Sequence, residues 1–206
     1  MKIKEIEEHA NKYGVPIIRN DSHVLLEKLI TESKPKHILE IGTAIGFSGI
    51  IMLKSSNADL ITIEHSKELA KQAKNNFKKE KLDKRTQIIV GDCQVEIAKM
   101  TASKKYDNYF DFIFLDGPKA QYDSMLENLL FLLADGGVFV ADNVLFRGYV
   151  EQANEPPTKR YKTIIKRLNT FIENCKNNPK LTNFELKNIE DGVIVAKKVT
   201  NEKQTN

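Results

Sequence analysis

Acidic residues accompany five apolar stretches of the chain, and they are the side chains best suited to chemistry. Apolar stretches run into Glu64, Asp92, Asp116 and Asp142, and Glu40 lies within the first stretch. Each carboxylate next to an apolar core needs a partner, because burying an unpaired charge is costly. Five such acids are therefore better explained by a ligand site than by packing.

The spacing of Glu64 indicates a nucleoside ligand. Glu64 stands 22 residues after Gly42, where an acid ending a second strand accepts hydrogen bonds from the ribose hydroxyls. The glycines from Gly42 to Gly49 read GxxxGxxG, whereas the fingerprint of NAD-binding proteins reads GxGxxG. Such a turn presents backbone N–H groups to a ligand, and Gly91 and Asp92 are placed to meet an adenine edge. The pattern predicts a nucleoside cofactor other than NAD.

Asp116, Asp142 and Asn143 supply two carboxylates and an amide, an all-oxygen set that suits Mg²⁺ or another divalent cation. A divalent ion there would lower the pKa of a bound hydroxyl. Lys119 follows Asp116 by three residues and is placed to act on the same hydroxyl as a general base. Two alternatives stay open: that Asp142 and Asn143 form a simple turn, and that Lys119 is a surface charge.

The elements that would position these residues alternate between strand and helix patterns. Two helices are predicted ahead of the first strand, over residues 3–13 and about 24–30. Further helices are predicted between successive strands, and one over residues 162–176 precedes a closing strand pair. Gly136 and Gly137 are predicted to turn the chain into the fifth strand. The alternation predicts an α/β fold with a mostly parallel sheet, in which ligands bind at the carboxyl ends of the strands. The predicted strands cover residues 38–41, 60–63, 87–90, 110–115 and 138–141, with the closing pair at 184–187 and 193–196.

Length and composition predict a single domain. The chain has 206 residues, of which 41% are apolar, enough for one core. No apolar run reaches the roughly 18 to 20 residues of a membrane span, and the N-terminus is too charged for a signal peptide, so we expect a cytoplasmic protein with no membrane partner. The two cysteines lack metal-ligand spacing and should be reduced thiols. The predicted parts are N-terminal helices (1–34), a cofactor-binding core (35–143), a basic segment (144–180) and closing strands (181–199).

The basic segment makes a polyanionic partner plausible without requiring one. The net charge is +4, and residues 144–180 hold eight Lys or Arg against three Glu. A solvated basic loop and helix is the alternative interpretation.

Several motifs resemble those of the cation-dependent class I O-methyltransferases, which include catechol and caffeoyl-CoA methyltransferases. The resemblance covers about residues 35–150 and the terminal strand after Asp191 and Gly192. It implies a Rossmann-like class I methyltransferase fold: a seven-stranded, mostly parallel sheet with helices on both faces and a terminal antiparallel strand. The motifs, in chain order, are LEIGTAIGFS, TIEHS, VGDCQ, FLDGPK and ADNVL.

The same resemblance implies the cofactor S-adenosylmethionine, metal ligation by Asp116, Asp142 and Asn143, and Lys119 as the catalytic base. Gly117 and Pro118 depart from the usual family pattern, although the spacing to Lys119 is kept. The implied cofactor-binding residues are Val15, Glu40, Gly42, Thr43, Gly46, Ser48, Glu64, His65, Gly91, Asp92, Cys93 and Asp116.

Outside the shared core, VPII, ADNVLFRGYV and PPTKRYK resemble the bacterial tRNA 5-hydroxyuridine methyltransferases of the TrmR type. That resemblance implies methylation of a wobble 5-hydroxyuridine in tRNA to 5-methoxyuridine, and a homodimer formed through the N-terminal helices. Arg147, Lys159, Arg160 and Lys162 would contact phosphates of the anticodon stem-loop. The alternatives are the same chemistry on a small catechol-like or acyl-CoA substrate, and a non-catalytic RNA-binding module.

Overall fold

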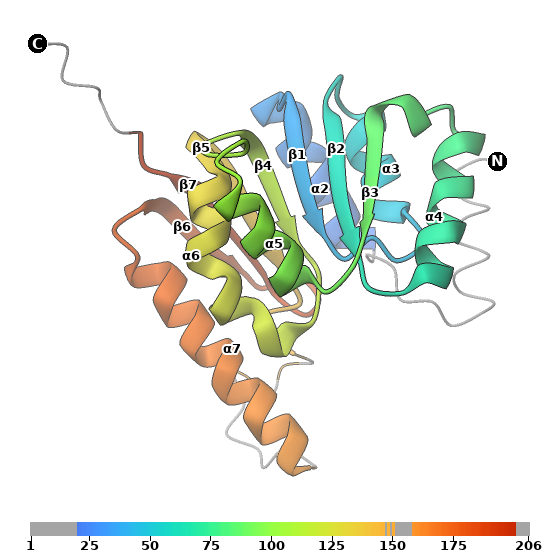
Figure 1. The fold of residues 1–206 in the computed structure, drawn as a ribbon. Coiled ribbons are helices and arrows are strands. Elements are labelled where there is room, and N and C mark those ends of the chain that lie inside the picture. The colour runs from blue at the N-terminus through green and yellow to red at the C-terminus, as the bar shows by residue number, and fades with distance from the viewer. Residues whose placement is uncertain (1–19, 147, 149, 151–157, 201–206) are drawn as a thin grey trace, which may run out of the picture.

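The computed structural model describes residues 20–146, 148, 150 and 158–200 and forms a seven-stranded sheet covered by helices on both faces (Figure 1). The sheet order is β3-β2-β1-β4-β5-β7-β6. The strands are β1 (His37–Ile41), β2 (Asp59–Glu64), β3 (Thr86–Val90), β4 (Phe110–Leu115), β5 (Leu133–Asp142), β6 (Leu181–Lys187) and β7 (Val193–Lys198). The helices are α2 (Asn20–Ser33), α3 (Phe47–Lys54), α4 (Lys67–Lys79), α5 (Cys93–Ala102), α6 (Tyr122–Leu132) and α7 (Lys159–Asn177), with short 3₁₀ turns η1 (Asp83–Arg85) and η2 (Lys119–Gln121).

The first five strands pair in parallel, and the closing strands do not. β5 pairs with β7 in antiparallel orientation, and β7 pairs in the same way with β6. β7 therefore runs against the other strands, and the predicted fold class with its terminal antiparallel strand is confirmed.

Alternation along the strands gives the sheet two apolar faces. In β1, Leu39 and Ile41 pack with α5, α6 and α7, which lie in front of the sheet in Figure 1. Ile38, from the same strand, packs with α2, α3 and α4 on the other face. Two helical layers thus hold the strands in place, and the carboxyl ends remain open to a ligand.

Two predicted boundaries were wrong. Gly136 and Gly137 lie inside β5 and not in a turn before it, because β5 begins at Leu133 and its register against β4 shifts between Phe110 and Phe112. A Cβ on Gly137 would lie 2.8 Å from the Ala134 carbonyl oxygen, so the irregular strand needs glycine at that point.

Helix α7 begins at Lys159, three residues before the predicted start at residue 162. The hydroxyl of Thr158 accepts a hydrogen bond from the backbone N–H of Tyr161 and caps the helix there. The predicted helix over residues 3–13, Val15 and Arg147 lie outside the described residues.

The strand order creates a crevice at the carboxyl edge of the sheet. The chain runs outward from β1 to β3 and then returns to place β4 on the other side of β1. Ligands of open α/β sheets bind at such a reversal of strand order. No helix among the described residues is both long and apolar enough to cross a bilayer.

Candidate active site

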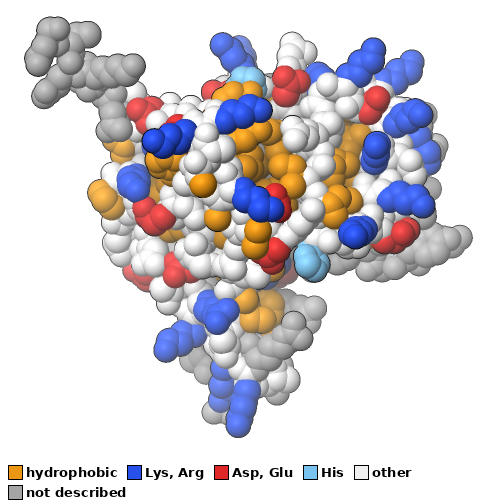
Figure 2. Space-filling view, viewed as in Figure 1, with side chains coloured by type: hydrophobic (Ala, Val, Ile, Leu, Met, Phe, Trp, Pro, Cys, Tyr) orange, Lys and Arg blue, Asp and Glu red, His pale blue; other side chains and the backbone are white. Residues whose placement is uncertain are grey.

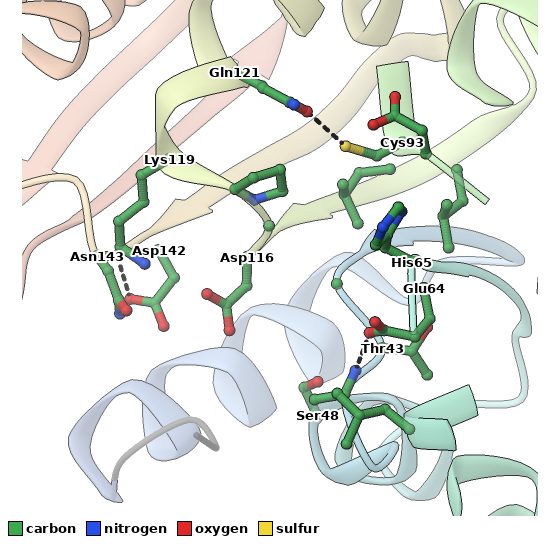
Figure 3. A pocket seen from close by; sticks show the side chains of 18 of the residues that line it. Thr43, Ser48, Glu64, His65, Cys93, Asp116, Lys119, Gln121, Asp142 and Asn143 are labelled. Atoms are coloured by element: carbon green, nitrogen blue, oxygen red, sulfur yellow. Dashed lines mark hydrogen bonds between the residues drawn. The ribbon is translucent and has the colours of Figure 1, made fainter. Parts of the chain in front are cut away.

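A cavity of about 800 Å³ opens at this crevice, and most of the predicted site residues line it. Twelve of the predicted cofactor, metal and catalytic residues form its wall: Gly42, Thr43, Ser48, Glu64, His65, Gly91, Asp92, Cys93, Asp116, Lys119, Asp142 and Asn143. Figure 3 shows Glu64 and Thr43 on one side of the opening, and Asp116, Asp142, Asn143 and Lys119 on the other. The cavity therefore has a side suited to a nucleoside and an acidic side.

Glu64 closes the nucleoside side at the end of β2. Its two carboxylate oxygens accept hydrogen bonds of 2.8 Å from the backbone N–H groups of Ala44 and Ser66. Each oxygen keeps a further lone pair, since a carboxylate accepts about four hydrogen bonds. A fixed, buried carboxylate of this kind is suited to receive two ribose hydroxyls.

Glu40 lies behind the cavity wall. It lies two residues after Ile38 in β1 and so shares the face that packs against α3. Its carboxylate accepts hydrogen bonds from Ser48 of α3 (2.5 Å) and Thr62 of β2 (2.7 Å). The Thr62 hydroxyl is in turn 2.6 Å from that of Thr43. Burial raises the pKa of Glu40 to about 7, against the hydrogen bonds, which lower it. Of this network only Ser48 and Thr43 reach the cavity, so Glu40 acts through them.

Gly46 also lies outside the cavity wall. A Cβ at this position would lie 3.0 Å from the ring of Phe77, so Gly46 allows α4 to approach the turn.

Gly42 brings the cofactor turn against the strand that carries Asp116. Its φ is +101°, and a Cβ there would lie 2.1 Å from the Asp116 carbonyl oxygen. Only glycine tolerates both the left-handed backbone and this approach. The end of β1 and the end of β4 are therefore in direct contact.

Asp116 and Asp142 form the acidic side of the cavity. Burial, followed by the neighbouring charge of Asp142, raises the pKa of Asp116 to about 8, and Lys119 opposes the shift. Burial likewise raises the pKa of Asp142, whose Oδ1 accepts a hydrogen bond of 2.7 Å from the backbone N–H of Asn143. Two like charges held together in this way favour a bound cation.

The donor set fits a hard divalent cation. Within the described part of the chain, no three His, Cys, Asp or Glu residues gather as a metal cluster, so the set consists of two carboxylates and the Asn143 amide. None of the described residues donates a hydrogen bond to the Asp116 carboxyl. Oxygen ligands in small number, with room for water, are typical of Mg²⁺ sites.

Lys119 reaches the acidic side from η2. Figure 3 shows its side chain directed toward Asp142 and Asn143. Pro118, which departs from the usual family pattern, lines the cavity and precedes the turn. The departure thus leaves Lys119 in the cavity wall.

Tyr122, at the start of α6, ties together the two strands that carry the acids. Its hydroxyl lies 3.3 Å from the Leu115 carbonyl oxygen and 3.2 Å from that of Asp142, and it can donate to either. Burial, with the charges of Asp116 and Asp142, raises the pKa of Tyr122 well above its usual value, so the phenol stays a donor.

The predicted adenine end has a structural function of its own. Asp92 caps α5 by accepting hydrogen bonds from the backbone N–H groups of Gln94 (3.0 Å) and Val95 (3.2 Å). The Cys93 thiol donates to Oε1 of Gln121 at 3.2 Å, and burial raises its pKa. Gln121 therefore joins η2 to α5 in the cavity wall, a contact that the sequence did not indicate.

The turn between β6 and β7 is the part of the site that sequence reasoning missed. Asp191 lines the cavity, and its carbonyl oxygen accepts a hydrogen bond of 2.7 Å from the backbone N–H of Leu145. Gly192 accepts likewise from Val144 at 3.0 Å. Asp191 and Gly192 were expected only to join the closing strands, because the sequence does not tell that β7 lies beside β5. Other lining residues not predicted include Phe47, Leu69, Pro118, Gln121 and Phe146.

Two of the predicted RNA contacts can be located. Lys159 and Lys162 are exposed on α7, outside the cavity, and Lys162 lines a separate groove. Arg160 lies in the same helix, although its side chain is not among those described.

Comparison with known proteins agrees with this geometry. The chain is 33% identical over 135 residues to a catechol O-methyltransferase of Niastella koreensis, a match covering 64% of this chain and 60% of the relative. It is 27% identical over 128 residues to a caffeoyl-CoA O-methyltransferase of Stellaria longipes, covering 61% of this chain and 53% of the relative. The matches thus span only about half to three fifths of these curated relatives.

Solved structures match over nearly the whole chain. A Staphylococcus aureus protein, solved as a candidate caffeoyl-CoA O-methyltransferase, superposes with a TM-score of 0.87 at 28% identity, covering 96% of this chain and 92% of that one. An O-methyltransferase from Bacillus cereus, solved with SAH, shares the fold with a TM-score of 0.80 at 24% identity, covering 95% and 90% of the two chains. A family model described as O-methyltransferase matches residues 2–199. The chain therefore belongs to the O-methyltransferase family.

Proposed function

We propose that this protein is an S-adenosylmethionine-dependent O-methyltransferase assisted by a divalent cation, and that its acceptor is the 5-hydroxyl of a wobble 5-hydroxyuridine in tRNA. The observation that carries the proposal is the union, in one cavity, of Glu64 with Asp116, Asp142, Asn143 and Lys119. One side of this cavity is suited to a nucleoside, and the other is acidic and rich in oxygen ligands. Direct methyl transfer in such a cavity needs no covalent nucleophile from the protein.

Glu64 and the Gly42 turn would hold the methyl donor. Glu64 offers free lone pairs to the ribose, and the turn offers backbone N–H groups to the amino-acid portion. The sulfonium of S-adenosylmethionine supplies an activated methyl group. Glu40 would act only by orienting Ser48 and, through Thr62, Thr43.

Asp116, Asp142 and Asn143 would hold the cation. When bound, Mg²⁺ would lower the pKa of the acceptor hydroxyl and stabilise its oxyanion. The main-chain bonds from Asp191 and Gly192 to the segment after Asn143 would fix this side of the site.

Lys119 would take up or share the acceptor proton at its Nζ. Direct transfer of the methyl group from sulfur to the acceptor oxygen would need no covalent protein intermediate. The chain's contribution is positioning and charge stabilisation.

The choice of RNA as the substrate rests on charge near the cavity. Lys159 and Lys162 are exposed on the first turn of α7, and Figure 2 shows Lys and Arg side chains gathered along the projecting part of the molecule that this helix forms. Arg147 and Arg160 would add to this charge. Electrostatic contact with phosphates supplies a large share of the affinity of nucleic-acid binding.

The test is mass spectrometry of tRNA nucleosides from cells with and without the gene. We expect 5-methoxyuridine to be replaced by 5-hydroxyuridine in the deletion strain, and to be restored by the wild-type chain but not by Lys119→Met. No change in this pair of nucleosides would overturn the proposed substrate.

A small acyl-CoA or catechol-like acceptor is the second candidate, favoured by the names of the relatives at 33% and 27% identity. It predicts methyl transfer to free catechols or acyl-CoA esters. It also predicts that the amounts of 5-methoxyuridine and 5-hydroxyuridine in tRNA do not change when the gene is deleted. A non-catalytic RNA-binding module predicts no calorimetric binding of S-adenosylmethionine.

A further inference from the structure

We propose that a second groove, between α6 and the outer half of α7, is a binding site for backbone phosphates of the RNA substrate. This inference rests on the proposed tRNA substrate, and it adds Lys166 and Arg167 to the predicted contacts. The groove has a volume of about 550 Å³ and is lined by Asp123, Lys162, Thr163, Lys166, Arg167 and Thr170.

The groove is built on a helix that is only half embedded. Leu168, Phe171, Ile172 and Cys175 bury the inner half of α7 in the core. No side chain described in the outer half, up to Arg167, is fully buried, and Figure 1 shows this half extending beyond the carboxyl edge of the sheet. The core therefore holds the helix firmly while its outer half meets solvent beside the active site.

Among the described residues that line the groove, three cations (Lys162, Lys166 and Arg167) face one acid, Asp123. Lys162 and Lys166 are one turn apart, about 6 Å along the helix axis, and like charges at this spacing destabilise a helix. Among the described residues, neither lysine forms an ion pair, and the one acid of the groove, Asp123, accepts a hydrogen bond of 2.6 Å from Asn174. An anionic ligand would relieve this repulsion.

The cations, and not the threonines, would make the phosphate contacts. The hydroxyls of Thr163 and Thr170 donate to the carbonyl oxygens of Lys159 and Lys166 at 3.3 and 3.1 Å. Their donor capacity is thus taken up within the helix.

Arg167 joins the groove to the active-site turn. Its Nη1 donates a hydrogen bond of 3.0 Å to the carbonyl oxygen of Ala120, the residue after Lys119 in η2. A strand bound in the groove would therefore lie against the outer side of the turn whose inner side carries Lys119. Arg167 has further N–H groups for a phosphate, since a guanidinium carries five.

The extended shape of the basic surface favours RNA over a single phosphate cluster. Exposed Lys159 begins α7, one turn before Lys162 of the groove. Figure 2 shows Lys and Arg side chains along the projecting part of the molecule, which suits a chain of successive phosphates. An acyl-CoA also carries phosphates, but they are clustered in one small molecule. The experiment below distinguishes RNA phosphates from those of an acyl-CoA.

The experiment measures binding of a fluorescently labelled anticodon stem-loop RNA by anisotropy over a range of NaCl concentrations. We expect Lys162→Ala/Lys166→Ala to weaken binding at least about tenfold and to reduce the slope of log affinity against log salt by about 1.4 to 1.8, or about 0.7 to 0.9 for each lysine removed. The matched control is Lys176→Ala, on the same helix beyond the groove, which should bind like wild type.

Catalysis supplies a second readout. The double variant should raise KM for the RNA while leaving kcat at saturating RNA and the calorimetric affinity for S-adenosylmethionine unchanged. Arg167→Lys, which keeps the charge but not the fork geometry, should lower kcat more than it weakens RNA binding.

Each negative outcome has its own meaning. Wild-type binding constants and salt slope in the double variant would overturn the groove even if tRNA is methylated. Failure of the wild-type chain to bind the RNA would overturn the proposed substrate as well. Displacement of the RNA by free coenzyme A, together with methyl transfer to an acyl-CoA, would assign the groove to that ligand and contradict the inference.

Discussion

Oε2 of Glu64 accepts a hydrogen bond of 2.8 Å from the backbone N–H of Ala44, and this bond ties the end of β2 to the glycine turn. Ala44 has a φ of +46°, an unfavourable conformation for a residue with a Cβ, so the Glu64 carboxylate supports a strained turn as well as facing the cavity.

Glu64→Gln should weaken S-adenosylmethionine binding about 10- to 100-fold. The amide loses the charge and one of the two acceptor oxygens, and hydrogen bonds to charged groups contribute about 1.5 to 3 kcal/mol. Isothermal titration calorimetry measures the effect, with Glu68→Gln, an exposed acid in the first turn of α4, as the control. Equal affinity in the two variants would remove Glu64 from the cofactor site.

Asp142→Asn should have opposite effects on metal binding and on stability. We expect affinity for Mn²⁺, used as a spectroscopic probe, to fall by more than about 100-fold, since losing even an outer partner of a metal ligand costs about 10- to 100-fold. Above about pH 8, where Asp116 is ionised, the melting temperature of the metal-free protein should rise, because the variant removes the cost of burying the Asp142 charge and its repulsion with Asp116. S-adenosylmethionine binding should be largely retained. Asp59→Asn, at the opposite end of the sheet, should change none of these, and loss of stability in Asp142→Asn would contradict the like-charge account.

Glu40 should make the protein less stable as the pH rises. Its pKa is about 7 when folded against a usual value of 4.5, so the folded state binds the proton more tightly than the unfolded state does. The resulting stability is fully present below about pH 4.5 and is lost as the pH rises through about 7, a decrease of about 3 kcal/mol. Urea unfolding of the wild type and of Glu40→Gln at pH 5 and pH 8 isolates this contribution. Parallel pH profiles in the two proteins would exclude it.

Gly192→Ala should be far more harmful than Gly136→Ala, although both glycines have positive φ. A Cβ on Gly192 would lie 2.2 Å from Cγ of Leu145, whereas at Gly136 the nearest atom is 3.5 Å away. We expect about 1 to 2 kcal/mol of destabilisation from backbone strain at Gly136, and about 1 to 3 kcal/mol more at Gly192 from overpacking. Chemical denaturation measures both. Adding Leu145→Ala should partly rescue Gly192→Ala in Mn²⁺ binding, because the clash displaces the segment after Asn143.

The strand ends were the most predictable part of the site. Glu64, Asp116 and Asp142 each follow an apolar run, and parallel strands bring such ends to one edge, so local pattern was sufficient. Glu40 was expected in the cofactor site, but strand alternation directs it to α3. Asp191 was not foreseen as a cavity residue, since its position depends on the pairing of β7 with β5, a contact between distant segments that no local periodicity records. The start of α7 was misplaced because a capping hydroxyl, and not the apolar pattern, sets it.

The contact between Gly42 and the main chain of Asp116 has a thermodynamic consequence. The turn proposed to hold the methyl donor and the strand proposed to hold the cation meet with no space for even a methyl group, so neither can shift alone. Occupancy of one should therefore alter the affinity of the other, and linkage requires the factor to be the same in both directions. Titrating S-adenosylmethionine with and without cation, and cation with and without S-adenosylmethionine, should close a cycle whose two coupling constants are equal and different from one.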